Sequence, residues 1–186
     1  RDFAEKILTK MGVEVEFFDP YIGAAIEEKF KSNTTLLVME TPGSHSFELP
    51  DVPAIAAKCK EHGVWSVIDN TWATPLYFKP LAVGVDVVVH AATKYIAGHS
   101  DILMGVVCCN EKAWPKVFDA VTTMGQTATP DDVYVAYRGL HTMKARIEAA
   151  FENAKLVVDW LQNRPEVERV LWPVLESHPS SRLPIL

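Results

Sequence analysis

The chain has 186 residues, of which 48% are hydrophobic and 23% are charged, a balance typical of a globular domain and unlike that of a disordered chain. Its formal net charge of −6 at pH 7 argues against a general affinity for nucleic acid or for an anionic membrane surface. No apolar run reaches the ~18 residues that a membrane span requires.

Helices and strands are predicted to alternate through the first half of the chain. Apolar residues at helical spacing predict helices over residues 3–11, 22–30 and 52–61. Asp51 and Gly63 are suitable residues for the start and the end of the third helix. Strands are predicted over residues 13–18, 35–39, 64–68, 85–91 and 105–109. This alternation predicts an α/β domain with a mostly parallel sheet.

The second half is predicted to be mainly helical. Helices are expected over residues 112–124 and 130–162, followed by a strand over 167–171. The proline-containing tail, residues 173–186, is interpreted as a linker. Because the chain opens directly into a helical pattern without a starting Met, we expect residues 1–172 to be an incomplete domain of a longer polypeptide.

The three cysteines, Cys59, Cys108 and Cys109, indicate a reducing environment. An odd number with two adjacent members does not suit a disulfide framework, and the spacing does not suit a zinc site. We therefore predict a cytoplasmic protein without a bound metal. Cys108 and Cys109 are expected to be buried in a strand, because a free cysteine packs as a small hydrophobic side chain.

Two predicted strands are each followed by an ionisable residue, Asp69 after the first and Lys94 after the second. Ligands of open α/β sheets bind beyond the carboxyl ends of the strands, so a carboxylate and a lysine delivered there favour a reactive pocket. A structural salt bridge, or two unrelated surface residues, is the alternative interpretation. His90, inside a strand, is interpreted as a packed histidine rather than a base.

Four short segments share the pattern of a known enzyme signature. They are Asp69-Asn70-Thr71, Ala92-Thr93-Lys94-Tyr95, Gly98-His99-Ser100-Asp101 and Arg138-Gly139-Leu140-His141-Thr142. These segments resemble the Cys/Met-metabolism family of pyridoxal-phosphate (PLP) enzymes. Within that family the similarity is greatest to the cystathionine β-lyases, on residues 18–24, 40–44 and 69–72, whereas residues 73–75 are more similar to the γ-type enzymes.

The resemblance implies an aspartate-aminotransferase-like fold (fold type I), with residues 1–172 in a PLP-binding large domain whose mixed, mainly parallel sheet is flanked by helices. Residues 173–186 would lead toward a C-terminal domain. Lys94 would bind pyridoxal 5'-phosphate as a Schiff base, Asp69 would face the pyridine nitrogen and Thr93 would contact the phosphate. Ser44 is a further candidate to approach the cofactor ring. Ala91 stands where many family members have a serine, which removes one phosphate contact.

The implied reaction is the α,β-elimination of cystathionine to homocysteine, pyruvate and ammonia, with Lys94 as the base and proton donor. A reaction of the cystathionine γ-synthase, cystathionine γ-lyase or methionine γ-lyase type is one alternative, and an inactive fragment of such an enzyme is another. The resemblance also implies a small sulfur amino acid as substrate, a role in methionine biosynthesis and transsulfuration, and a homotetramer built from dimers. No nucleic acid or membrane partner is expected.

Overall fold

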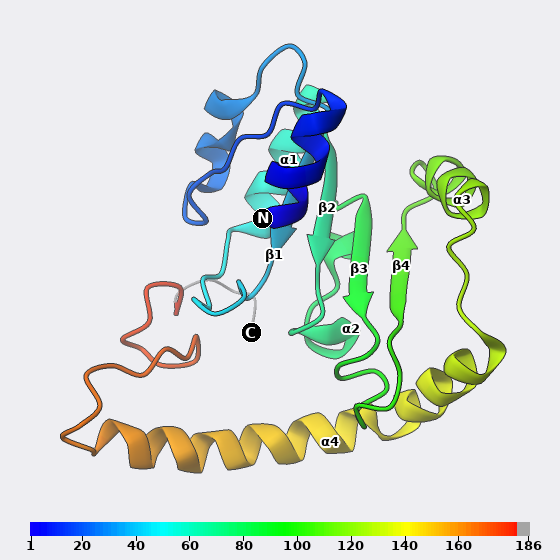
Figure 1. Ribbon diagram of the computed structural model, residues 1–186. Coiled ribbons are helices and arrows are strands. Elements are labelled where there is room, and N and C mark those ends of the chain that lie inside the picture. Colours follow the sequence, from blue (N-terminus) through cyan, green and yellow to red (C-terminus); the bar gives the residue numbers. More distant parts are fainter. Residues whose placement is uncertain (182–186) are drawn as a thin grey trace.

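The computed structural model describes residues 1–181, so the last part of the predicted linker, 182–186, lies outside the described residues. Four strands form one sheet in the order β1 (Leu36–Glu40), β2 (Trp65–Asp69), β3 (Val87–Ala91) and β4 (Gly105–Cys109). The first three strands are parallel, and β4 runs antiparallel to β3 (Figure 1). The predicted mixed, mainly parallel sheet is therefore confirmed.

Four α-helices accompany the sheet in the described part of the chain: α1 (Val52–His62), α2 (Thr74–Tyr77), α3 (Trp114–Thr123) and α4 (Pro130–Gln162). Shorter helical segments are η1 (Ala4–Leu8), η2 (Thr9–Met11), η3 (Gly23–Lys29) and η4 (Pro80–Val83). As predicted, Asp51 caps α1 by accepting a hydrogen bond from the Ala54 N–H at 3.1 Å, and Gly63 ends it in the left-handed conformation. The long helix α4 runs beneath the carboxyl ends of the parallel strands (Figure 1).

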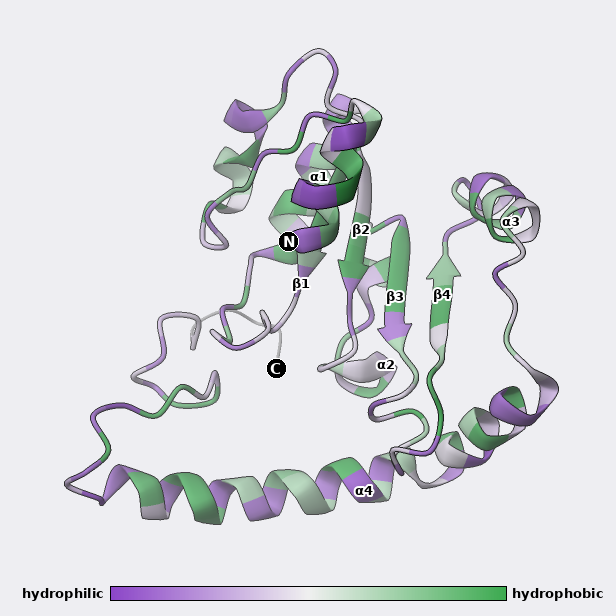
Figure 2. Cartoon of the chain, in the orientation of Figure 1, coloured by the Kyte–Doolittle hydropathy of each residue, from purple (hydrophilic) through white to green (hydrophobic). Residues whose placement is uncertain are grey.

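The main core lies between α1 and one face of the sheet. It contains buried side chains from both layers: Leu37, Met39, Val52, Ile55, Cys59, Ile68 and Val88. Burial raises the pKa of the Cys59 thiol to about 11, so this cysteine is a packing residue. On the opposite face of β1, Leu36 and Val38 are 53% and 59% exposed. Figure 2 shows that hydrophobic residues follow the strands and also recur along α4.

Two predicted strands are wrong. Residues 13–18 do not join the sheet, and the alternating acids that suggested a strand, Glu14 and Glu16, instead form ion pairs with Lys31 and Lys29. Residues 167–171 form no strand either, because the N–H of Val167 turns back to the carbonyl of Arg164 at 3.1 Å. Alternation alone does not make a strand when no neighbouring strand pairs with it.

The expectation that Cys108 and Cys109 are buried is also wrong. Cys108 is exposed and Cys109 is half-buried. Both belong to β4, which is an edge strand of the sheet and lacks the helical cover that α1 gives to the centre.

The described part of the predicted linker folds back onto the domain. The N–H of Leu49 donates to the buried hydroxyl of Ser180 at 3.0 Å, and the N–H of Ser180 donates to Nδ1 of His178 at 3.2 Å. The boundary at residues 172 and 173 stays a prediction. Within residues 1–181, none of the helices has the length and apolar character needed to cross a membrane.

Candidate functional site

The candidate site lies where the parallel strands end. Glu40 is the last residue of β1 and Asp69 the last of β2, and the two are partners in the strand register. β3 ends at Ala91, and Lys94 follows three residues later in the connection to β4. The carboxyl ends of neighbouring parallel strands meet at one edge of a sheet, which brings these residues together.

A pocket of about 660 Å³ opens at this edge. The four predicted site residues Lys94, Asp69, Thr93 and Ser44 all line it. The remaining lining residues are Glu40, Thr71, Trp72, Ala91, Tyr95, Gly98, Ser100 and Arg146. The fold thus brings together side chains from β1, β2, the connection after β3, and α4.

Lys94 sits in a tight turn. Its N–H donates to the carbonyl of Ala91 at 2.9 Å, and its carbonyl accepts from the N–H of Gly98 at 2.8 Å. The side chain is exposed to the open pocket, and none of the ion pairs within residues 1–181 involves it. A structural salt bridge between Lys94 and Asp69, the alternative interpretation from the sequence, is therefore not formed between these described residues.

Asp69 is half-buried and oriented by its own turn. Its Oδ1 accepts a hydrogen bond from the N–H of Thr71 at 2.9 Å. The Thr71 hydroxyl in turn accepts from the N–H of Ala91 at 2.7 Å and so ties the end of β2 to the end of β3. These contacts fix the carboxylate at the pocket wall.

The hydroxyl of Thr93 contacts the main chain of Met104. It accepts from the Met104 N–H at 2.9 Å and lies 3.3 Å from the Met104 carbonyl oxygen. Thr93 therefore joins the beginning and the end of the β3–β4 connection, which carries Lys94. Ser44 is tethered differently: its N–H donates to Oε2 of Glu40 at 3.1 Å, and its hydroxyl donates to the other oxygen of that carboxylate.

Backbone strain gathers around the pocket. The residues other than glycine with a positive φ in the described chain are His45 (70°), Phe47 (64°), Thr74 (59°) and Ser100 (58°). Ser100 lines the pocket, His45 and Phe47 lie in the loop that carries Ser44, and Thr74 begins α2, two residues after Trp72. Phe47 also packs edge-on against Trp72, with 4.9 Å between the ring centroids. Each such residue costs of order 1–3 kcal/mol, and residues of this kind cluster at functional sites.

His90 lies on β3 close to the pocket but does not line it. The side chain is buried, with 7% exposed. Burial lowers its pKa, although the Asn70 backbone and the charge of Asp69 act in the opposite direction. These facts agree with a packed, neutral histidine.

Arg146 is the pocket residue that the sequence did not indicate. It comes from α4, about fifty residues after Lys94, and its guanidinium donates to the carbonyls of Tyr95 at 2.9 Å and Ile96 at 3.2 Å. Only the neighbouring Arg138–Thr142 block pointed to this part of α4. Trp72 and Glu40 stood in the segments that carried the family resemblance, but no role in the pocket had been assigned to them.

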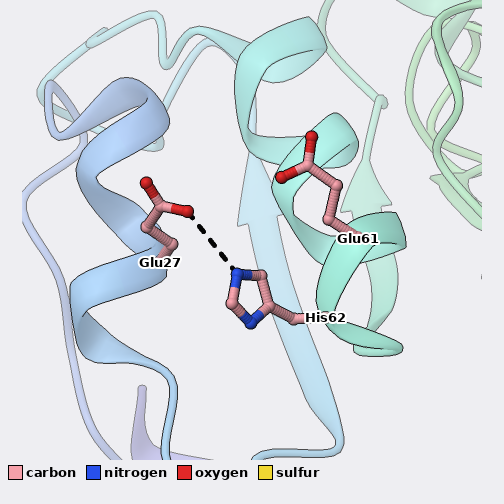
Figure 3. A group of neighbouring side chains, drawn as sticks. All are labelled: Glu27, Glu61 and His62. Carbon is pink, nitrogen blue, oxygen red and sulfur yellow. Dashed lines mark ion pairs between the residues drawn. The ribbon is translucent and has the colours of Figure 1, made fainter.

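A second group of polar side chains lies far from this pocket, between η3 and α1. Figure 3 shows Glu27 facing His62, at 3.5 Å, with Glu61 beside them. The ammonium of Lys58 lies 2.9 Å from both Glu27 and Glu61, and this contact lowers the pKa of the Glu27 carboxyl. The cluster is thus a surface ion-pair network between η3 and α1, in which Lys58 neutralises the two carboxylates.

The chain is similar to proteins named for several reactions. A protein of Rhizobium johnstonii, whose name assigns it provisionally to cystathionine beta-lyase, is 49% identical over 98% of this chain and 46% of its own length. The cystathionine beta-lyase of Escherichia coli is 41% identical over 94% of this chain and 45% of its own. An L-alanine/L-glutamate racemase of Wolbachia pipientis is 42% identical over 98% of this chain and 45% of its own. The chain spans about half the length of these curated relatives.

Solved structures agree with the fold. The crystal structure of cystathionine gamma-lyase from Lactobacillus plantarum, complexed with L-serine, superposes with a TM-score of 0.93 at 29% identity, over 98% of this chain and 48% of that one. The predicted large-domain architecture is therefore confirmed. The sequence model of the Cys/Met metabolism PLP-dependent enzymes matches residues 1–184. The chain belongs to the Cys/Met metabolism family of PLP-dependent enzymes.

Proposed function

We propose that the protein binds pyridoxal 5'-phosphate through Lys94 and acts as a carbon–sulfur lyase that cleaves cystathionine by α,β-elimination. The observation that carries this proposal is that one pocket is lined by Lys94, which forms no ion pair among residues 1–181, and by Asp69, a carboxylate at the end of β2. The names of the relatives from Escherichia coli and Rhizobium johnstonii support the choice of substrate.

The residues present fit the cofactor. Lys94 offers a primary amine for the aldehyde group, and Asp69 offers a carboxylate for a protonated ring nitrogen. Hydroxyls of Thr71, Thr93 and Ser44 line the same pocket and are suited to the phosphate and the ring oxygen. The pocket volume of about 660 Å³ lies in the range of small-molecule and cofactor sites.

When bound, pyridoxal phosphate supplies an electron sink for negative charge at the substrate Cα. The amine of Lys94, exposed to the pocket and free of ion pairs among residues 1–181, is our candidate base for the Cα proton. The same group is the candidate donor of that proton to the leaving sulfur, because it is the lysine amine that lines the pocket. With one water consumed, the products are homocysteine, pyruvate and ammonia.

The role proposed for Asp69 is electrostatic. Its orientation by the Thr71 N–H leaves Oδ2 without a hydrogen-bond partner among the described residues. A carboxylate in this state favours a cationic partner and would keep the ring nitrogen protonated. Thr71 is proposed to hold the ends of β2 and β3 together through its contact with Ala91. Thr93 is proposed to hold the connection between β3 and β4 through its contact with Met104.

Two other reactions are supported by particular observations. The structural neighbour named as a cystathionine gamma-lyase favours γ-elimination, as does the Ala73-Thr74-Pro75 segment. The Wolbachia pipientis relative, as similar as the Escherichia coli lyase, favours racemisation of a small amino acid, in which the Cα proton is removed and returned to the opposite face. All three reactions begin with removal of the same proton.

The products separate these candidates. The full-length protein is incubated with cystathionine and, separately, with L-alanine. Pyruvate together with a free thiol supports β-elimination, 2-oxobutyrate supports γ-elimination, and D-alanine without keto acid supports racemisation. Lys94→Ala should remove every one of these activities, whereas Lys79→Ala, in a loop outside the pocket, should retain them.

We further propose that the full-length protein is a cytoplasmic homotetramer built from dimers. Large apolar side chains are exposed along α4, among them Tyr134, Tyr137, Leu156 and Trp160, and exposed apolar surface of this extent favours association. Light scattering of the full-length protein over a concentration series tests this proposal, and a monodisperse monomer with full activity would contradict it.

A further inference from the structure

Among the described residues, the hydrogen bonds from helix α4 to the turn that carries Lys94 come from one side chain, that of Arg146. Nη2 of Arg146 donates to the carbonyl oxygens of Tyr95 at 2.9 Å and Ile96 at 3.2 Å. These are the two residues that directly follow Lys94. Within residues 1–181, no backbone N–H hydrogen-bonds to either carbonyl in this turn. Arg146 is therefore the group that satisfies them.

Arg146 is itself held in place from α4. Its Nε donates to the hydroxyl of Thr142 at 3.1 Å, and Nη2 also donates to the carbonyl of Gly139 at 2.9 Å. A planar guanidinium with several donors in a fixed arrangement can hold these acceptors at once, which a lysine cannot do.

Two glycines make room for this contact. A Cβ on Gly98 would lie 2.3 Å from Cζ of Arg146, and Gly98 adopts a φ of +81°. A Cβ on Gly139 would lie 2.2 Å from the carbonyl oxygen of Ile96. A Cβ at position 139 would thus meet the backbone of the Lys94 turn, whereas a Cβ at position 98 would displace the Arg146 guanidinium.

We propose that Arg146 is a positioning residue for Lys94: by fixing the carbonyls of Tyr95 and Ile96, its guanidinium holds the turn that presents the Lys94 amine to the pocket. The proposal rests on the proposed role of Lys94 in binding the cofactor. Every hydrogen bond of Arg146 to the described residues goes to the Lys94 turn or to α4, so its action on the chemistry is through Lys94. The guanidinium forms no salt bridge among residues 1–181, and a charged donor binds carbonyl groups more strongly than a neutral one.

The test is the rate at which the cofactor-free, full-length protein takes up pyridoxal phosphate. Condensation of the Lys94 amine with the aldehyde forms a C=N bond and releases one water, and it is followed by visible absorbance and by induced circular dichroism of the bound cofactor. Borohydride trapping and peptide mapping then identify the labelled lysine. The variants are Arg146→Gln and Arg146→Lys. The matched control is Lys144→Gln, on the same helix, which removes only an exposed pair with Glu148 at 3.7 Å.

Arg146→Gln is expected to slow attachment by about tenfold or more, the factor associated with losing a hydrogen bond to a charged group. The induced circular dichroism should also fall, since the lysine no longer holds the cofactor in one orientation. Arg146→Lys, which retains the charge, should recover part of both signals, and Lys144→Gln should match the wild type.

Rates are expressed per folded protein, from far-ultraviolet circular dichroism at a temperature well below unfolding. If Arg146→Gln attaches the cofactor at the wild-type rate per folded protein with a wild-type circular dichroism signal, Arg146 has only a structural role and the proposal is overturned. If Arg146→Gln does not fold, Arg146→Lys decides, and wild-type behaviour of that variant overturns the proposal. If the wild-type label lies on another lysine, the proposed function itself fails, which is a separate result.

Discussion

Glu40 and Asp69 end two neighbouring parallel strands and lie opposite each other in the register, yet they have different partners. Both carboxylate oxygens of Glu40 accept hydrogen bonds from Ser44. Asp69 accepts one from Thr71 through Oδ1, and its Oδ2 has no partner among the described residues. The Glu40 carboxylate thus anchors the loop that carries Ser44, whereas Oδ2 of Asp69 can still accept a hydrogen bond from a cation in the pocket.

This difference predicts different effects of two isosteric substitutions. Asp69→Asn should leave pyridoxal phosphate attached but lower kcat by about a hundredfold or more, the loss typical of removing one preorganised electrostatic contact. Glu40→Gln, the matched variant on β1, should change KM through the Ser44 loop and leave kcat within a fewfold of the wild type. Steady-state kinetics on the same substrate check both. Near-normal kcat in Asp69→Asn would exclude Asp69 as the partner of the ring nitrogen.

The strand ends were predictable because their signals are local. The α1 helix followed from its cap at Asp51 and its stop at Gly63, and the four strands that pair in the sheet were predicted to within two residues. The positions of Asp69 and Lys94 after their strands followed from the same patterns. The family resemblance then predicted a chemical role for both residues.

Features that depend on distant partners were not predictable. Residues 13–18 alternate like a strand but pair their acids with Lys29 and Lys31, and no local signal distinguishes the two outcomes. The antiparallel direction of β4 depends on how the residues between β3 and β4 fold, because a connection of that length also suits a parallel crossover. Arg146 contacts a turn about fifty residues earlier in the chain, and neither periodicity nor spacing reveals such a contact.

Adding a hydroxyl at position 91, where the family resemblance leads us to expect a serine, should strengthen cofactor binding. Ala91 lines the pocket beside Thr71, and Ala91→Ser would add a donor for the phosphate without altering the backbone contact with Thr71. We expect release of pyridoxal phosphate to slow by about tenfold, as for a hydrogen bond to a charged group. Dialysis against an aldehyde scavenger measures release, and Ala82→Ser, on η4 outside the pocket, is the control. An unchanged release rate would show that the phosphate lies elsewhere.

The buried His90 predicts a pH dependence of stability. Burial lowers its pKa in the folded protein below the ordinary value of 6.5, so in the window between the two values the unfolded chain binds more protons. The stabilisation is therefore complete above about pH 6.5 and is lost as the pH falls through the lowered pKa. Urea unfolding between pH 7 and lower pH should show this loss in the wild type and in His141→Gln, at an exposed histidine of α4. In His90→Gln the free energy of unfolding should depend less steeply on pH than in the wild type. An equally steep dependence would mean that other groups cause the effect.

Replacing Gly139 by alanine should destabilise the protein, although the same exchange usually stabilises a helix. Alanine is favoured over glycine inside a helix by about 1 kcal/mol, so propensity alone predicts that Gly139→Ala stabilises α4. The added Cβ, however, would lie 2.2 Å from the Ile96 carbonyl oxygen and 2.7 Å from that of Ala97, and both are backbone atoms that cannot rotate away. We therefore expect Gly139→Ala to destabilise the protein by about 1–3 kcal/mol, the range for overpacking a close contact.

The control is Ala150→Gly, at an exposed position of the same helix, where only helix propensity changes. This substitution should destabilise the protein by about 1 kcal/mol. Urea unfolding of the cofactor-free, full-length protein gives both values on one scale. Gly139→Ala and Ala150→Gly should therefore both lower the free energy of unfolding. A stabilising Gly139→Ala would mean that α4 does not approach the Lys94 turn as closely as described, and that Arg146 reaches the Tyr95 carbonyl by another route.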